Sequence, residues 1–375
     1  MIARLVAFDT TSVKSNMDLI EDVAGYLRGH GAAVHVLANG DGTKANLFAS
    51  VGPDTGGGIC LSGHTDVVPV EGQPWDSDPF RVVARDGRLY GRGTADMKGF
   101  IATALTLVPE MTRRRLSRPI HFALSYDEEI GCFGAPHMIA AFGDTLPRPD
   151  LVIVGEPTEM KVVNANKGIV GLITTVTGLE AHSSLTGSGV NAILHAAQLL
   201  RHLEDMARDF ATARDDAFEP PYTTLSVGTI AGGTATNIIP RECTFQWEFR
   251  PLPGVDIDAV VASFDHFAAE TVLPPMQAVH PDAAIETTIR VVVPPLAAEP
   301  DSAAETLARA LTGANRAHTA SFAAEAGQFQ EAGIATVICG PGAIAQAHQP
   351  NEYIALDQIA ACETFLHRLL DRLSE

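Results

Sequence analysis

A polar trio, His64-Thr65-Asp66, interrupts an apolar run, and its residue types are those that bind and orient a metal ion. Residues 58–61 read as a short buried strand, and a parallel sheet places its chemistry just past the carboxyl ends of its strands. His64 offers a neutral imidazole nitrogen to a metal, and Asp66 is well placed to take the proton on the other ring nitrogen. Because a His-x-Asp pattern is weak by itself, the hypothesis depends on the rest of the chain.

Asp96 is a second candidate ligand, because it stands between glycines in the stretch 91–99. Glycines on both sides of one carboxylate suggest tight backbone turns that aim it at a target. An apolar helix is expected over 100–108, so the plainer alternative is that Asp96 caps this helix, which would stabilise it by about 1 kcal/mol.

Further carboxylates follow buried strands. The acids 127–129 come after the apolar stretch 120–125, and Glu156 comes after 151–154. Three consecutive acids repel one another unless cations offset them, although a solvated loop is the plainer alternative. Neighbouring residues of an extended segment point to opposite sides, so Glu128 and Glu129 could have different roles. We count four strand ends that each deliver a histidine or a carboxylate, which is hard to obtain by accident.

Charge and composition exclude several classes of protein. The chain has 375 residues and a formal net charge of −19, and its lysines and arginines form no stripe, so we expect no nucleic-acid partner. No apolar run is long enough to span a bilayer, so we expect no membrane association. The N-terminus lacks the features of a secretion signal. It starts inside a helical pattern, and we expect a few residues upstream of it.

The five cysteines are odd in number, scattered and mostly in apolar surroundings. This usage is typical of a reducing cytoplasm and not of a disulfide framework or a cysteine zinc site. We therefore predict a cytoplasmic protein.

The predicted elements describe an α/β protein of two domains, which is also what the length suggests. The catalytic domain comprises 1–166 and 295–375, with a mixed, mostly parallel sheet; within it, the glycine-rich stretch 52–58 is predicted to be a hairpin turn. The inserted domain, 167–294, has a strand-helix-strand-strand-helix-strand order, which indicates a ferredoxin-like α+β domain with an antiparallel sheet. Its exposed edge would invite pairing between subunits. The predicted elements of the insertion are strands at 168–176, 223–230, 243–250 and 285–293, and helices at 190–203 and 256–270.

Nitrogen and oxygen ligands without a thiolate suit zinc, cobalt or manganese, and the chain offers five of them: His64, Asp96, Glu129, Glu156 and His348. The stretches that carry them resemble, in order and spacing, the M20 family of di-metal amidohydrolases and peptidases. The resemblance runs through the whole chain and is closest to the acetylornithine deacetylases. The stretches in question are 62–69, 91–99, 127–129, 155–158 and 348–353, with 6–12, 228–240, 325–327 and 339–342 typical of the deacetylases.

The resemblance implies a role for each residue of the centre. His64 and Glu156 would hold one metal, Glu129 and His348 the other, and Asp96 would bridge them. Two divalent ions, zinc or alternatively cobalt, bring four positive charges against three carboxylates, which leaves one for a bridging hydroxide. Glu128 would be the general base. Asp66 would orient His64, and a cis peptide bond is implied after Asp96.

The resemblance also implies that the inserted domain is a lid. His182 would reach across a homodimer into the partner's active site and stabilise the oxyanion, although a capping or core histidine is the plainer alternative. Asn237 and Arg250 match positions that bind the substrate's α-carboxylate, and Glu325 stands in a further deacetylase stretch that we assign to substrate binding. A surface ion pair is the plainer alternative for Arg250.

The implied reaction is the hydrolysis of N2-acetyl-L-ornithine, a small-molecule substrate, to L-ornithine and acetate in arginine biosynthesis. Asn166, Ala323-Ala324 and Gly187-Ser188 depart from the pattern near the expected substrate pocket, so the preferred acyl amine stays open. N-acetylcitrulline, other N-acyl amino acids and succinyl-diaminopimelate are the alternatives. A non-catalytic binding protein on this scaffold would be expected to lose ligands or the base, and all are present.

Overall fold

The structure is a computed structural model that describes residues 1–374, and its chain divides into two compact units. Unit 1 comprises Met1–Ala165, Leu296–Thr319 and Ala324–Glu375, and unit 2 comprises Asn166–Pro295 and Ala320–Ala323. The chain leaves unit 2 after Pro295 and contributes to it again with the short segment Ala320–Ala323. No pattern in the sequence predicted this second contribution.

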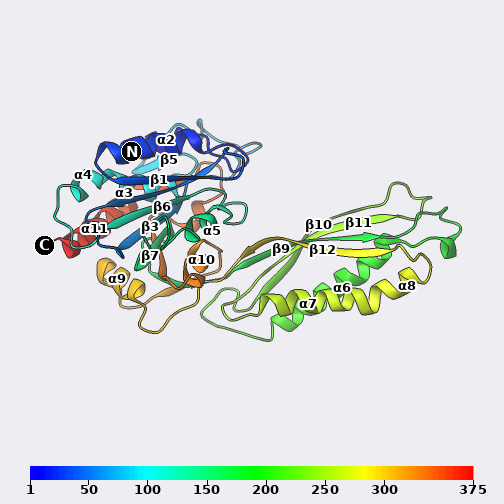
Figure 1. Ribbon diagram of the computed structural model, residues 1–375. Helices are drawn as coiled ribbons and strands as arrows, with labels where there is room; N and C mark the ends of the chain where they lie inside the picture. Colours follow the sequence, from blue (N-terminus) through cyan, green and yellow to red (C-terminus); the bar gives the residue numbers. More distant parts are fainter. Residues whose placement is uncertain (375) are drawn as a thin grey trace. The chain divides into compact units, whose positions relative to one another are not determined.

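Unit 1 is built on an eight-stranded sheet in the order β1-β2-β6-β3-β7-β14-β8-β13 (Figure 1). The central strands β6, β3, β7 and β14 are parallel, whereas β1, β2 and β8 pair with their neighbours in antiparallel fashion. The strands are β1 (Ala33–Ala38), β2 (Ala45–Val51), β3 (Ile59–His64), β6 (Ile120–Ser125), β7 (Leu151–Pro157), β8 (Val163–Asn166), β13 (His318–Ala320) and β14 (Ala335–Gly340). A mixed, mostly parallel sheet was predicted, and this prediction is confirmed.

The helices of unit 1 bury the sheet. Apolar side chains of α2, α3, α9 and α11 share one core with the central strands, and α5 and α10 pack against one another. A small sheet of β4, β5 and β15 lies apart from the large one. These elements are α1 (Ile2–Val6), α2 (Met17–Gly29), β4 (Val83–Arg85), β5 (Arg88–Tyr90), α3 (Lys98–Thr106), α4 (Val108–Met111), α5 (Gly134–Ile139), α9 (Ala303–Thr312), α10 (Ala326–Glu331), the 3-10 turn Ile344–Gln346, β15 (Tyr353–Ala355) and α11 (Leu356–Leu373).

The glycine-rich stretch 52–58 is not a hairpin turn, and that prediction was wrong. It joins β2 to β3, and β6 lies between these two strands. A side chain at Gly57 would meet the carboxylate of Asp150, and one at Gly58 would meet the carbonyl oxygen of Pro119. The glycines therefore let the chain cross close to neighbouring backbone on its way past β6.

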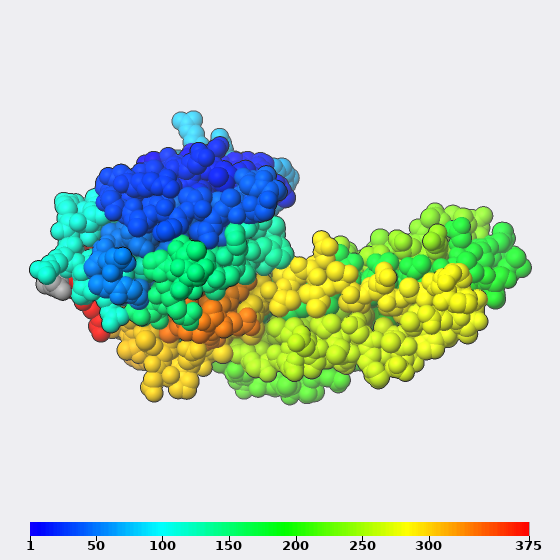
Figure 2. Space-filling view, viewed as in Figure 1, coloured from blue at the N-terminus to red at the C-terminus, as the bar shows by residue number. Residues whose placement is uncertain are grey.

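Unit 2 has a four-stranded antiparallel sheet in the order β10-β11-β9-β12, with helices on one face. The strand and helix order follows the predicted ferredoxin-like pattern, and α7 and α8 are visible at the surface (Figures 1 and 2). Strand β10 is one edge of the sheet. The elements are β9 (Ile169–Thr177), the 3-10 turn Thr186–Ser188, α6 (Ala192–Phe210), β10 (Thr224–Gly232), β11 (Glu242–Arg250), α7 (Ile257–Phe267), the π-helical turn Ala268–Val272, α8 (Leu273–Gln277) and β12 (Ala284–Val293).

In the part of the chain that the structure describes, no helix combines the length and the apolar character needed to cross a membrane.

Candidate metal centre

His64 is the last residue of β3, and its ring is held between two acids. Its Nδ1 atom lies 3.0 Å from the backbone oxygen of Asp66 and 3.6 Å from the Asp66 carboxylate. Its Nε2 atom lies 3.0 Å from Asp96 and 3.7 Å from Glu156. One ring nitrogen is therefore fixed by the segment that follows β3, and the other faces two of the predicted ligands. This is the orientation that a metal-binding imidazole needs.

Asp96 lies between two histidines. Its Oδ1 atom is 3.0 Å from His64, and its Oδ2 atom is 3.3 Å from His348. His348 also lies 2.9 Å from Glu129. Of the predicted ligands, Asp96 is the one whose two oxygens face both histidines, as a bridging carboxylate requires. The peptide bond after Asp96 is cis, as the resemblance implied.

Asp96 does not reach this position in the way the sequence suggested. It lies in the turn ahead of α3, whereas His64 and Glu156 belong to β3 and β7 and the Glu128–Glu129 pair follows β6. It does not cap α3 either, because the N-cap position is Met97, which makes no side-chain cap. The turn reaches the sheet because Gly155 of β7 leaves room for the Phe100 ring of α3, which a Cβ atom would overlap.

Glu128 and Glu129 enter the same cluster. Ligand atoms of His64, Asp96 and Glu129 lie within 4.8 Å of one another, and so do those of His64, Glu128 and Glu156. The geometry alone therefore allows Glu128 to be either a ligand or a base. The predicted division of labour between the two glutamates stays a prediction that metal analysis can test.

The electrostatics of the cluster fit a divalent cation. Burial, with neighbouring carboxylates, raises the pKa of Glu128 and Glu156 well above the usual value and that of Glu129 to about 7. Hydrogen bonds to Asp96 and Glu129 raise the pKa of His348 to about 10. Buried Oε1 of Glu156 has no hydrogen-bond partner among the described residues. The three glutamates resist ionisation, the histidines retain protons, and one carboxylate oxygen has no partner. These are the properties expected of a metal site in which protons take the place of the cation.

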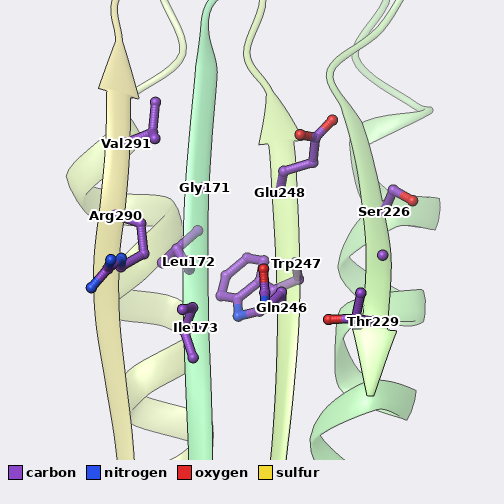
Figure 3. Close-up of a pocket in the computed structure, with 11 residues that line it drawn as sticks. Gly171, Leu172, Ile173, Ser226, Thr229, Gln246, Trp247, Glu248, Arg290 and Val291 are labelled. Atoms are coloured by element: carbon purple, nitrogen blue, oxygen red, sulfur yellow. The ribbon is translucent and has the colours of Figure 1, made fainter. Parts of the chain in front are cut away.

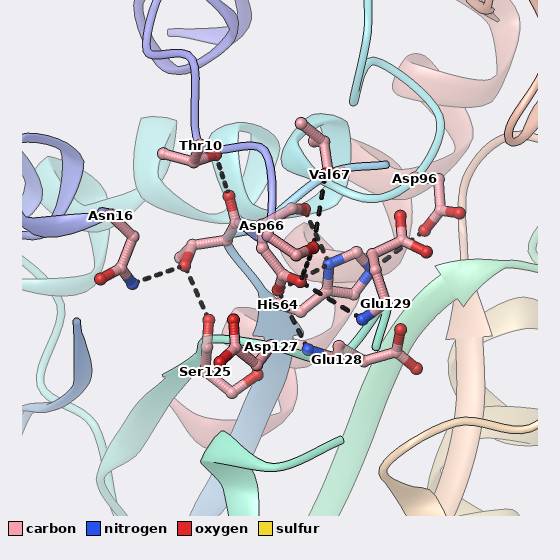
Figure 4. Close-up of polar contacts among 12 residues, drawn as sticks. Thr10, Asn16, His64, Asp66, Val67, Asp96, Ser125, Asp127, Glu128 and Glu129 are labelled. Atoms are coloured by element: carbon pink, nitrogen blue, oxygen red, sulfur yellow. Dashed lines mark hydrogen bonds and ion pairs between the residues drawn. The ribbon is translucent and has the colours of Figure 1, made fainter. Parts of the chain in front are cut away.

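Asp66 has a role that the sequence did not indicate. Its carboxylate accepts hydrogen bonds from the backbone N–H groups of Glu128 (3.1 Å) and Glu129 (3.3 Å), and from the Ser12 hydroxyl (2.7 Å) (Figure 4). The contact that was predicted with the His64 ring is made chiefly by the Asp66 backbone oxygen. Asp66 thus ties the loop after β6 to the segment after β3. Such a long-range bond leaves no local signal in a sequence.

Glu352 was also missed, although it stands in the stretch 348–353. It is buried and accepts backbone hydrogen bonds from Gly93, Ala95 and Asp96 at 2.8–3.1 Å. It also pairs with buried Arg92 at 2.8 Å. A buried acid must be paired, but the partners of Glu352 lie about 260 positions earlier in the chain, so its local sequence gave no signal.

Glu325 lies inside unit 1, 1% exposed. Its two carboxylate oxygens accept hydrogen bonds from the hydroxyls of Ser125 and Ser62, which belong to β6 and β3. Burial raises its pKa to about 6. Both oxygens face the protein interior, so this geometry offers no support for the substrate contact that we predicted.

In unit 2, the structure brings His182 and Asn237 together. The backbone N–H of Ser183 donates to the backbone oxygen of Asn237 at 3.0 Å, and His182 and Ile238 form an isolated antiparallel β-bridge. The His182 ring is exposed, and its Nδ1 atom lies 2.8 Å from the Ser184 hydroxyl. The ring is therefore not a core histidine, but the capping alternative stands, because the backbone N–H of Ser184 donates to Nδ1 at 3.2 Å.

Arg250 lies at the opposite end of the same sheet. Residues 181–183 and 237–239 follow and precede the paired ends of β9 and β11 at Thr177 and Glu242, whereas Arg250 ends β11. The nine residues of β11 separate these ends by about 25 Å at the usual rise of a strand. Within one chain, Asn237 and Arg250 cannot bind the same carboxylate.

A groove of about 410 Å³ crosses the helix-free face of this sheet (Figure 3). Gly171 lies at its middle, with Glu248 on β11 and Arg290 on β12 to either side. The Arg250 Nε atom donates to Glu248 at 3.1 Å, so the guanidinium lies beside the groove. This ion pair is the plainer alternative that the sequence offered for Arg250. It uses the Nε atom, so the two terminal guanidinium nitrogens do not take part in the bond to Glu248.

Comparison with known proteins places these observations in a family. An acetylornithine deacetylase of Myxococcus xanthus is 37% identical to this chain, over 98% of this chain and 95% of its own length. The structure of an M20 family metallo-carboxypeptidase from Sulfolobus solfataricus is similar, with a TM-score of 0.77 and 17% identity over 98% of this chain and 97% of that one. A dinuclear metal-binding M20 peptidase from Bacillus subtilis gives a TM-score of 0.67 and 15% identity over 100% and 96% of the two chains.

The family model described as Peptidase family M20/M25/M40 matches residues 60–372. This range contains each of the residues assigned above to the metal centre and the lid. The family includes dinuclear metal-binding hydrolases, in agreement with the clustered histidines and carboxylates of unit 1. The chain is a hydrolytic enzyme that belongs to peptidase family M20/M25/M40.

Proposed function

We propose that the chain hydrolyses the amide bond of N2-acetyl-L-ornithine to give L-ornithine and acetate, as a step of arginine biosynthesis. The observation that carries the proposal is the position of Asp96, whose two oxygens lie 3.0 Å and 3.3 Å from His64 and His348. An arrangement with a shared carboxylate and terminal ligands on both sides suits a two-metal amidohydrolase. The choice of substrate rests on the relative named acetylornithine deacetylase.

Each residue of the centre has a proposed role. His64 and Glu156 would hold one ion, Glu129 and His348 the other, and Asp96 both. When bound, the ions supply Lewis acidity, which polarises the amide carbonyl and lowers the pKa of water. Glu128 accepts a proton from the attacking water at its carboxylate and passes it to the leaving amine. A C–O bond forms at the acetyl carbon as the C–N bond breaks. Asp66 holds the backbone of Glu128 in place.

The lid residues act in two copies of the chain under this proposal. Arg250 would bind the α-carboxylate through its terminal guanidinium nitrogens. Asn237 and His182, at the other end of the sheet, would then come from the partner of a homodimer, with His182 stabilising the oxyanion. An exposed edge strand supports pairing of two copies, because β10 presents Val227 and Ile230 with 37% and 52% of their surfaces exposed.

We propose zinc as the metal, with cobalt as an alternative that the same ligands accept. The five cysteines are buried and unpaired. Buried free thiols support a reducing compartment, and we propose that the reaction takes place in the cytoplasm.

The test is a substrate panel with purified protein supplied with Zn²⁺ or Co²⁺. The expected result is acetate release from N2-acetyl-L-ornithine with the highest kcat/KM of the panel. The competing substrates are N-acetylcitrulline, other N-acyl amino acids and succinyl-diaminopimelate. A preference of more than about tenfold, or about 1.4 kcal/mol in transition-state free energy, for one of these would refute the proposed specificity.

The positions that depart from the deacetylase pattern make this panel informative. Asn166 donates a hydrogen bond to the Phe322 oxygen at 3.0 Å, so it lies next to the second departure, Ala323. Two of the three departures are therefore close together in the fold. A chelated sample is the control, and activity that survives removal of the metals would overturn the two-metal mechanism itself.

A further inference from the structure

Arg92 stands outside the roles assigned so far, yet it contacts two segments around the metal centre, one at 73–75 and one at 349–352. It is 1% exposed. One guanidinium nitrogen donates to Glu352 at 2.8 Å and to the Gln349 oxygen at 3.4 Å. The second terminal nitrogen donates to the side-chain oxygen of Gln73 at 2.6 Å. The guanidinium also stacks over the Trp75 ring at 5.1 Å.

On one side, these contacts lead to Asp96. Glu352, the ion-pair partner of Arg92, accepts hydrogen bonds from the backbone N–H groups of Gly93 (2.9 Å), Ala95 (2.8 Å) and Asp96 (3.1 Å). Both Glu352 oxygens are occupied in this way. The carboxylate therefore fixes the turn that carries Asp96.

On the other side, the contacts lead to His348. The Gln73 side chain, held by Arg92, donates to the His348 backbone oxygen at 3.0 Å. The next residue, Gln349, is bonded to Arg92 directly. His348 has a φ of 61°, in the left-handed region that costs a non-glycine residue about 1 kcal/mol or more. The His348 backbone therefore needs such external bonds to keep its conformation.

We propose that Arg92 is a positioning residue that couples the His348 loop to the Asp96 turn and thereby retains the metal of the Glu129–His348 pair. The proposal rests on the ligand assignment given under the proposed function. His64 and Glu156, on β3 and β7, are not among the residues that Arg92 bonds, so the effect falls mainly on one of the two metals. Arginine is required because one planar fork serves Glu352, a backbone oxygen and a side-chain amide together, whereas a lysine ammonium is a point charge.

The experiment measures metal binding and does not depend on turnover. Metal-free parent, Arg92→Lys and Gln73→Ala proteins are titrated with Co²⁺, followed by its visible absorption and by metal analysis. Arg92→Lys retains a positive charge beside buried Glu352, and Gln73→Ala removes the link to His348 without touching the ion pair. Arg88→Lys is the matched control, because Arg88 stacks on Tyr353, next to Glu352 in the chain, at 4.2 Å and is exposed.

We expect the parent and Arg88→Lys to bind two ions per chain. In Arg92→Lys one ion binds as in the parent, and the dissociation constant of the other rises about 10- to 100-fold, the usual cost of losing a group that orients a ligand. Gln73→Ala shifts the same constant in the same direction by a smaller factor.

Two ions bound by Arg92→Lys with parental constants would overturn the proposal, and so would equal weakening of both ions. If the parent itself bound fewer than two ions, the ligand assignment would fail, and this proposal with it. The first result contradicts only the role of Arg92, whereas the last contradicts the proposed function, so the two failures are distinguishable. Far-ultraviolet circular dichroism of the metal-free proteins verifies that each variant is folded.

Discussion

The two units hold their predicted functional residues in opposite ways. In unit 1, the ligand atoms converge from two strands, the turn before α3 and two loops, with separations of 2.9–3.7 Å between paired groups. In unit 2, His182 and Asn237 share one end of the sheet, and Arg250 ends β11 at the other. The centre in unit 1 is assembled by one chain, whereas the residues in unit 2 are spread along a rigid sheet.

This difference teaches where a second copy of the chain is needed. Ligands that already contact one another, exposed His348 among them, are positioned by the fold of their own unit, and the partner need not contribute to them. Exposed residues about 25 Å apart along a strand cannot serve one substrate carboxylate in a single chain. Under the proposed roles, a homodimer that brings the His182 end of one unit 2 to the Arg250 end of the other would resolve the conflict. The predictions below test each half of this contrast.

The largest effect is expected from Glu128→Ala in unit 1. Removal of the general base should lower kcat by about 10⁴-fold or more, the upper part of the range for acid–base catalysis, while metal content stays near two ions per chain. Turnover and elemental analysis are measured on the same samples. Asp127→Asn is the matched control, because this neighbouring acid bonds to Lys44 and not to the cluster, and it should retain parental turnover within a few-fold.

Loss of a metal in Glu128→Ala would show that Glu128 is a ligand. That result is physically possible, since Glu128, His64 and Glu156 lie close enough to hold an ion. The roles of Glu128 and Glu129 would then have to be reassigned.

A smaller effect is expected from His182→Ala in unit 2. Loss of an oxyanion-stabilising group should lower kcat by about 10²-fold or more without changing metal content, because unit 1 holds the metals by itself. His266→Ala, at another exposed histidine on α7, should leave kcat unchanged. Steady-state kinetics on both variants check the expectation.

Mixing His182→Ala with Glu128→Ala tests the need for a second copy. Each variant is impaired for a different reason, and a heterodimer contains one site with an intact base and an intact histidine. Activity should therefore reappear on mixing, if the site is shared between copies. No recovery in heterodimers verified by native mass spectrometry would contradict the shared site and would leave the distance between Arg250 and Asn237 unexplained.

The sequence predicted this site better than it predicted the contacts around it. Apolar runs in the sequence predicted β3, β6 and β7, and the polar residues at their ends predicted ligands. Both predictions were possible because strand patterns and ligand types are local properties. The roles of Glu352 and of the Asp66 carboxylate were missed, since each bonds backbone groups far away in the chain. Residues 52–58 were misread for the same reason, because local glycine content does not show that β6 lies between the strands they join.

Substrate binding was predicted for Glu325, which is buried, and Glu325→Gln tests this prediction. If Glu325 contacted substrate, the variant should change KM. If it only bonds Ser125 and Ser62, KM should stay within about twofold and the change should appear in stability. This is the smallest effect on catalysis that we expect. The effect on the free energy of unfolding should depend on pH.

Burial raises the pKa of Glu325 from 4.5 to about 6, although the hydrogen bond from Ser125 and the neighbouring His64 oppose this rise. The folded protein thus holds this proton more tightly than the unfolded chain does, and the resulting stabilisation is present below pH 4.5 and is lost as pH rises through about 6. Glutamine does not titrate. The free energy of unfolding of the parent, minus that of Glu325→Gln, should therefore fall by about 2 kcal/mol between pH 4 and pH 7.5. Urea unfolding of the metal-free proteins measures it, because the titrations that parent and variant share cancel in the difference. A difference that does not vary with pH would mean that Glu325 keeps an ordinary pKa and is not confined to the interior.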